Sequence, residues 1–219
     1  MKNFLKTFHL QLLLMFRYLG LLIIKPSKAL NQLKKEKYQV HLTVLLFLIS
    51  VLLFTPFLVG AAFTLRPDGW VQLFVKVPQN MIYVYFAATA PLSIMLNMLS
   101  LGIIYFFAVF MGKEPKSNKQ LWSTTQFSLT LVVMYDFLVE AFAIVFLWIA
   151  GTQQFPTWLV IGMHLKYGVM FLWGIILLMF SIEVCFDKIK RWQSLLLSTL
   201  SYTGYFFLMA IWIGGWGIK

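Results

Sequence analysis

The charged residues of this chain are confined almost entirely to short segments that separate long apolar runs. Of the 219 residues, 61% are hydrophobic and 11% are charged, whereas a soluble domain has about 25% charged residues. A run of about 20 apolar residues has the length that crosses the hydrocarbon core of a bilayer. The sequence therefore predicts an all-α fold: a polytopic integral membrane bundle of helices.

Five apolar runs of this kind follow one another and form a single domain over residues 41–219. Each run predicts one transmembrane helix. The expected spans cover residues 41–65, 81–111, 121–150, 158–185 and 195–218.

Residues 1–40 are expected to form a separate cytoplasmic, amphipathic helical segment. On a helical wheel, most of the large apolar residues of 1–24 share one face, and Lys2, Lys6, His9 and Arg17 lie opposite. A secretion signal is not favoured, because Arg17 interrupts the apolar stretch and no small-residue cleavage site follows. Pro26 ends this helix, and a short basic helix leads to the first span. Two interpretations are open: the first helix lies in the membrane interface, or it packs beneath the bundle.

Lysine and arginine residues gather on alternate sides of the expected spans. Fourteen lie in the N-terminal segment and in loops 112–120 and 186–194, and three, Arg66, Lys76 and Lys219, lie on the other side. Positively charged loops remain in the cytoplasm. The sequence therefore predicts a multi-pass cell-membrane protein whose N-terminus is cytoplasmic and whose C-terminus is extracytoplasmic.

Ionisable residues inside expected spans are the first candidates for function, because charges in lipid are costly. Asp136 and Glu140 share one helix face in the third span. The next span runs antiparallel and brings Lys166 to a depth similar to that of Glu140, with His164 nearby. Asn97 in the second span is expected near the depth of Asp136. The expected intramembrane polar cluster is Asn97, Asp136, Glu140, His164 and Lys166.

Three interpretations of this cluster are open. It lines a pathway for ions, protons or substrate. Alternatively, it is structural: Glu140 and Lys166 form an ion pair and Asp136 bonds to Asn97 or a tyrosine. In the third interpretation, Lys166 extends its long side chain to the outer interface.

Two further features are expected to be structural. Glu183 and Asp187 lie beside Lys188, Lys190 and Arg191, and are interpreted as a charge cluster at the membrane boundary. Small residues permit close helix packing, so the glycines of the fourth span are expected to contact other helices; they are Gly162, Gly168 and Gly174.

The sequence contains none of the motifs that identify common enzymes or cofactor sites. It has no phosphate-binding loop, no dinucleotide fingerprint, no His-Glu-x-x-His and no Gly-x-Ser-x-Gly. A single cysteine, Cys185, excludes an intrachain disulfide and a cysteine-rich metal site. We expect no enzyme activity, no cofactor and no bound metal. The net charge of +11 is explained by membrane topology, so nucleic acid is not expected as a partner.

A family resemblance is carried by two short segments and the five spans that follow them. The segments are residues 25–30 (Lys-Pro-Ser-Lys-Ala-Leu) and 34–37 (Lys-Lys-Glu-Lys). Over about residues 25–215 the chain resembles the bacterial branch of the Yip family, the Ypt/Rab-interacting membrane proteins. The resemblance implies a basic amphipathic helix, five spans and a cytoplasmic N-terminus, and it implies companionship with ATP-driven (ABC-type) transport systems. The Tyr-Gly-Pro signature of the eukaryotic branch is absent, so Rab binding is not implied.

The leading functional hypothesis is a non-enzymatic accessory or scaffold subunit of a larger membrane complex, such as an ABC-type transport system. Its partners would be the lipid bilayer and other integral membrane proteins. The alternative is a small ion- or proton-coupled transporter that uses the intramembrane polar cluster. A third hypothesis, an intramembrane enzyme acting on lipids, has only the same polar residues available.

Overall fold

The computed structural model describes residues 2–36, 40–46, 48–49, 82–150 and 156–215. Every regular element in these residues is an α-helix, which confirms the all-α class. The helices are α1 (Lys2–Ile24), α2 (Pro26–Lys35), α5 (Ile82–Phe110), α6 (Asn118–Ala150), α7 (Thr157–Cys185) and α8 (Arg191–Gly215). Residues 40–46 are also helical.

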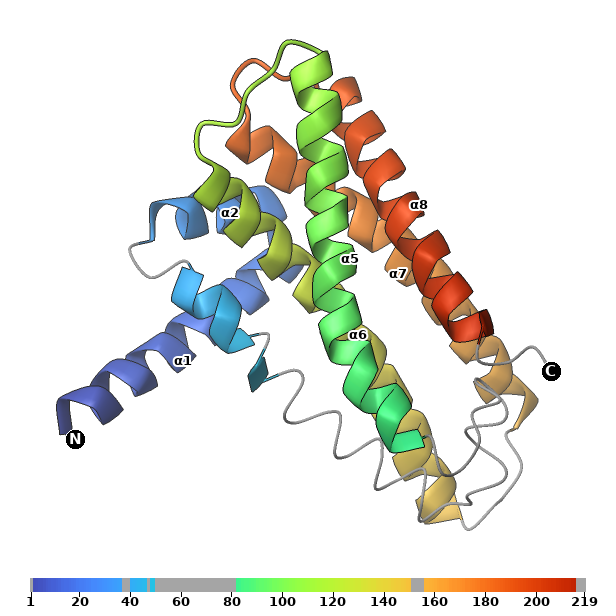
Figure 1. Cartoon of the computed structure of the whole chain (residues 1–219). Helices are drawn as coiled ribbons and strands as arrows, with labels where there is room; N and C mark the ends of the chain where they lie inside the picture. The colour runs from blue at the N-terminus through green and yellow to red at the C-terminus, as the bar shows by residue number, and fades with distance from the viewer. Residues whose placement is uncertain (1, 37–39, 47, 50–81, 151–155, 216–219) are drawn as a thin grey trace.

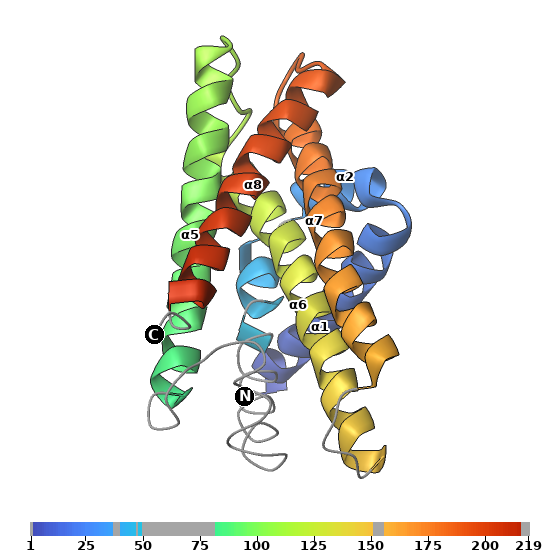
Figure 2. The ribbon, with the colours of Figure 1, turned by 90° about the vertical axis from the view of Figure 1, so that its right-hand side faces the viewer.

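Four long helices form a bundle, as Figures 1 and 2 show. Helix α7 packs against both α6 and α8, and α8 packs against α5. The turns 111–117 and 186–190 lie at one end of this bundle, which we call the inner end. Helices α5 to α8 coincide, within a few residues, with four of the five runs expected to be spans. The first expected span, 41–65, lies mostly outside the described residues.

One stretch among the described helices, Leu165–Cys185 of α7, has by itself the length and the apolar character needed to cross a membrane. It contains 21 residues with a mean hydropathy of 2.2, and about half of it is buried in the protein. The apolar stretches Phe8–Ile24 and Met95–Phe110 are shorter.

Helix α1 has two apolar faces with different surroundings. Met15, Tyr18, Leu19 and Leu22 are buried, and they recur at the three- and four-residue spacing of one helix face. Helix α1 packs on α2, and α2 packs on α6 and α7. The packing interpretation of α1 agrees with these contacts, and the interface interpretation stays a prediction. A second apolar set is exposed; its large members include Leu10, Leu13, Phe16 and Ile23.

The junction of α1 and α2 holds a tyrosine–carboxylate hydrogen bond. Tyr18 Oη donates to Glu36 Oε2 at 2.9 Å. Burial of the phenol, and next the hydrogen bond to the Glu36 carboxylate, raise the pKa of Tyr18 from 10.0 to about 12. The neutral phenol therefore helps to hold α1 against α2 at physiological pH.

The closest approach of two helices among the described glycines is at Gly174 in α7. A Cβ atom at Gly174 would collide with the ring of Tyr202 in α8, so a larger residue fits there only if that ring moves. The Tyr202 ring stacks on Tyr205 at 5.7 Å between centroids and contacts Phe171 at 5.9 Å. Gly162 and Gly168 have open space instead, so the expectation that all three glycines contact other helices was wrong for these two.

Candidate functional site

Helix α2 and the two turns are bound together at the inner end. Lys34 Nζ donates to Val184 O at 2.8 Å, so α2 satisfies a carbonyl in the last turn of α7. The backbone N–H of Lys116 donates to Cys185 O at 2.9 Å. The Lys116 ammonium also forms an ion pair with Asp187. Three basic segments that are far apart in sequence therefore meet at one end of the bundle.

The two acids expected in a boundary charge cluster lie at this end and are paired. Glu183 Oε1 lies 3.7 Å from Arg191 Nε and accepts a hydrogen bond from Ser194 Oγ at 3.2 Å. Asp187 pairs with Lys116 from the other turn. Because these side chains are largely or partly exposed, each pair contributes only about 0–1 kcal/mol.

Hydroxyl groups join α6 to α7 inside the inner half of the bundle. Ser128 Oγ lies 2.9 Å from Ser181 Oγ, and Thr124 Oγ1 lies 3.2 Å from the Cys185 sulfur. Ser181 Oγ also donates to Leu177 O at 2.9 Å. All four side chains that form the two interhelical contacts are fully buried. Such polar contacts between helices stabilise the packing of membrane helices by about 0.6–2 kcal/mol each.

A second polar group lies between α5 and α6. Asn97 Nδ2 donates to Gln126 Oε1 at 3.1 Å, and the neighbouring residues Ser100 and Thr125 are also polar and buried. We call these four residues the buried quartet. Four of their atoms have no hydrogen-bond partner among the described residues: Asn97 Oδ1, Ser100 Oγ, Thr125 Oγ1 and Gln126 Nε2. Each buried polar atom left unpaired costs about 1–3 kcal/mol, so the group is expensive unless it serves a ligand.

The position of Asn97 differs from the expected one. It bonds to Gln126, which precedes Asp136 by about 15 Å along α6 at 1.5 Å per residue. The expectation that Asn97 lies near the depth of Asp136 was therefore wrong. Helix α5 extends past the first turns of α6 at the inner end (Figure 1), so residues equally far from the connecting turn are not at equal depth.

Lys166 lies inside the bundle. It is 2% exposed and continues a buried line along α7 that includes Met170, Gly174, Leu177 and Ser181, whose three- and four-residue spacing defines one helix face. The Lys166 ammonium lies 4.6 Å from the centroid of the Tyr167 ring, a cation–π contact. The interpretation in which Lys166 extends to the outer interface was therefore wrong.

The antiparallel contacts between α6 and α7 give the relative depths of positions 140 and 166. Ser128 meets Ser181 on the inner side of them, and Phe146 meets Trp158 on the outer side, at 5.1 Å between ring centroids. The backbone positions 140 and 166 fall between these two contacts, at similar depth. The side chains of Asp136, Glu140 and His164 lie outside the described part of the structure, so the cluster with Lys166 stays a prediction.

Sequence reasoning missed the buried hydroxyl and amide residues of the inner half. The signal was present, because Ser123-Thr124-Thr125-Gln126 is a run of four polar residues at the start of an apolar segment. Such a run indicates contact with other helices rather than with lipid.

Within the described ranges, no group of three His, Cys, Asp or Glu side chains is arranged to hold a metal ion. Comparison of the chain with family models, with curated proteins and with solved structures gives no match.

Proposed function

We propose that this chain is a multi-pass protein of the cell membrane that serves as a non-enzymatic accessory or scaffold subunit of a larger membrane complex. The five expected spans would cross the bilayer, with the N-terminus in the cytoplasm and the C-terminus outside. Supporting this orientation, α2 and the two lysine-rich turns are held together at the inner end by Lys34 and Lys116. Basic segments on one side of a membrane favour the cytoplasmic side.

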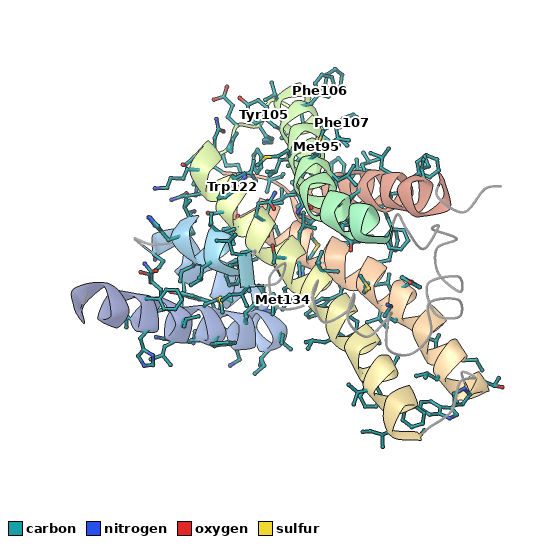
Figure 3. The ribbon with its side chains drawn as sticks, turned by 60° about the horizontal axis from the view of Figure 1, so that its bottom comes forward. Met95, Tyr105, Phe106, Phe107, Trp122 and Met134 are labelled. Carbon is teal, nitrogen blue, oxygen red and sulfur yellow. The ribbon has the colours of Figure 1, made fainter. Side chains whose placement is uncertain are left out.

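The observation that carries the proposed subunit role is an exposed apolar face along α5. Its large exposed members recur at helical spacing and end in an aromatic group: Met95, Met98, Leu99, Tyr105, Phe106, Phe107, Val109 and Phe110. Met95 is 68% exposed and Phe110 is 83% exposed. Figure 3 shows Tyr105, Phe106 and Phe107 spreading outward from the end of α5.

A glycine lies in the middle of this face. Gly102 is exposed, and a Cβ atom there would meet nothing within 4 Å. Small residues on an apolar helix face let a second helix approach closely. The α5 face is therefore suited to a partner helix, with Gly102 at the crossing point.

Among membrane complexes, we propose an ABC-type transport system as the partner. The support is the resemblance to the bacterial Yip branch, whose helix with an early proline and basic residues corresponds to α2. Pro26 is the first residue of α2, and Lys34 and Lys35 lie in its last turn. Membership of this family is likewise a proposal.

Purification of the tagged native protein in mild detergent tests the subunit role. A stoichiometric membrane partner is expected, and Gly102→Leu should release it because the added side chain blocks close approach. The matched control is Leu172→Ala on the exposed side of α7, which should keep the partner. If Gly102→Leu retains the partner, the α5 face is only a lipid contact and the proposed interface is wrong.

A second candidate, the small ion- or proton-coupled transporter, is favoured by the buried ammonium of Lys166. An ionisable residue buried within a membrane bundle is a default candidate for an ion or substrate pathway. Reconstitution of the protein alone in liposomes tests this function. Substrate-driven flux that Lys166→Met abolishes would favour the transporter over the subunit, whereas a flux-free, correctly folded protein would reject it.

A further inference from the structure

A line of buried hydroxyl groups runs along α8 from the inner end into the bundle. Ser194, Ser198 and Ser201 are spaced by four and three residues, so they share one helix face, and all three are fully buried. Ser194 Oγ contacts Glu183 Oε1 at the inner end, at 3.2 Å. Ser201 Oγ donates to Ser100 O at 3.0 Å. Ser198 Oγ, between them, donates to Leu195 O of its own helix at 2.9 Å. The serine line therefore begins beside the ion pairs of the inner end and ends at the backbone of Ser100, a member of the buried quartet.

The buried quartet lies well below the inner end. Gln126 is about 12 Å from the first residue of α6, and Ser100 is about 15 Å from the last residue of α5, at 1.5 Å per residue. The four atoms without a partner belong to α5 and α6, and two of them are on the amides that form the Asn97 to Gln126 hydrogen bond. Small ligands beside these side chains would satisfy them.

The chemistry of these atoms selects a neutral ligand. The atoms without a partner are one carbonyl oxygen, two hydroxyls and one amide NH₂, and the four residues carry no charge. A bound cation would meet the NH₂ group of Gln126, and a bound anion would meet the carbonyl oxygen of Asn97. A neutral molecule that both donates and accepts hydrogen bonds fits all four, and water is the smallest such molecule.

We propose that the buried quartet and the three serines of α8 hold water that exchanges with solvent at the inner end. The inner half of the bundle then contains a hydrated polar track that reaches from Glu183 to Asn97. This inference rests only on described side chains and does not depend on the proposed subunit role.

Silver-ion blocking of introduced cysteines tests the track in the full-length protein in lipid nanodiscs. The background variant is Cys185→Ala, which removes the single native thiol. Ser198→Cys and Ser100→Cys place a thiol on the track. The readout is the fraction of thiol blocked by silver ion before denaturation, measured afterwards with a fluorescent maleimide.

The matched control is Leu177→Cys, which replaces a fully buried apolar residue of α7. Leu177 is about 12 Å from the last residue of α7 at 1.5 Å per residue, a depth between those of Ser198 and Ser100, so depth alone would give the control a rate between those of the two track positions. Because a thiol ionises readily only where water is present, we expect the track thiols to be blocked about tenfold faster. Equal or slower blocking at both track positions would overturn the proposal.

Thermal stability provides a second measurement that does not use cysteine. In Asn97→Leu with Gln126→Leu, both amides are replaced by apolar groups of similar size. If water satisfies the quartet, the apparent Tm stays the same or falls, because Ser100 and Thr125 lose their water partners. If the site is dry, removal of the two amides, each of which has one buried atom without a partner, raises the Tm, and that result would also overturn the proposal.

Discussion

The two halves of α6 differ in how the polarity of a side chain is related to its burial. In the inner half, polar residues are frequent and every side chain from Ser123 to Val132 is buried. In the outer half the sequence is apolar apart from Asp136 and Glu140, yet Leu138, Phe142, Val145 and Ile149 are exposed. A soluble protein shows the reverse relation, with large apolar side chains inside and polar ones outside.

The difference comes from the number of neighbours at each depth. The inner half of α6 contacts α2 and α7, the helical residues 40–46 through the Thr43 to Ser123 hydrogen bond, and α5 through Gln126. Thr124 and Ser128 are stable there because they bond to Cys185 and Ser181 of α7. The outer half has fewer described neighbours, and apolar side chains on it suit a lipid environment. The comparison supports the proposed membrane location.

The largest effect on the free energy of unfolding is expected at the depth where the two halves meet. Gly174→Ala should destabilise the protein by about 2–3 kcal/mol, because the new Cβ collides with the buried ring of Tyr202. Gly168→Ala, in the open outer half, should instead stabilise it by about 0.5–1 kcal/mol through helix propensity. Thermal unfolding in one detergent measures both variants. Equal shifts of the same sign would show that the close approach at Gly174 has no energetic weight.

A charge on the outer half distinguishes lipid from water as its surroundings. Phe142 is 63% exposed, so Phe142→Lys would be almost neutral in a soluble protein. In a bilayer it should reduce insertion by about 2.5–3.5 kcal/mol if it lies near the centre. The yield of membrane-inserted protein measures this effect, and Glu114→Lys in the exposed turn 111–117 is the control. Normal insertion of Phe142→Lys would contradict the proposed membrane location of α6.

The inner half should be sensitive to loss of its hydroxyl contacts. Ser181→Val removes a group that bonds to Ser128, and leaves that serine with one partner fewer in a fully buried place. We expect a loss of about 1–2 kcal/mol in unfolding free energy. Leu138→Ala in the exposed outer half should change it by less than about 0.5 kcal/mol. Denaturation in mixed micelles measures both, and a larger loss for Leu138→Ala would reverse the comparison.

The smallest effect is expected at the junction of α1 and α2. Helix α2 packs on α6 and α7 at the inner half of the bundle. The pKa of Tyr18 is raised to about 12 from 10.0, so folding favours its protonated form. The stabilisation is fully present below pH 10 and is lost as the pH rises from about 10 to about 12. Tyr18→Phe should cost about 1 kcal/mol at pH 8 and remove this pH dependence. Measurement of the Tm against pH checks both statements. If Tyr18→Phe loses stability above pH 10 as the unchanged protein does, a group other than Tyr18 causes the alkaline loss of stability.

Sequence reasoning succeeded where a single helix carries the information. The ends of α5, α6, α7 and α8 follow from apolar runs bounded by charges and turns. Helical periodicity placed His9 and Arg17 on the polar face of α1, and both side chains are exposed. It failed where two helices are compared. Asn97 was expected near the depth of Asp136, but it bonds to Gln126. The offset of α5 along α6 is set by packing between the two helices and cannot be read from the side-chain pattern of either helix alone.

The sequence by itself determined the all-α class, the limits of the long helices and the basic character of the inner end, because periodicity and charge are local properties of one segment. Only the tertiary structure decided that Asn97 meets Gln126, that Lys166 is buried and that Gly174 alone among three glycines contacts a ring. These facts depend on how far one helix slides and turns against its neighbour. That offset is the sum of many side-chain contacts between segments distant in sequence.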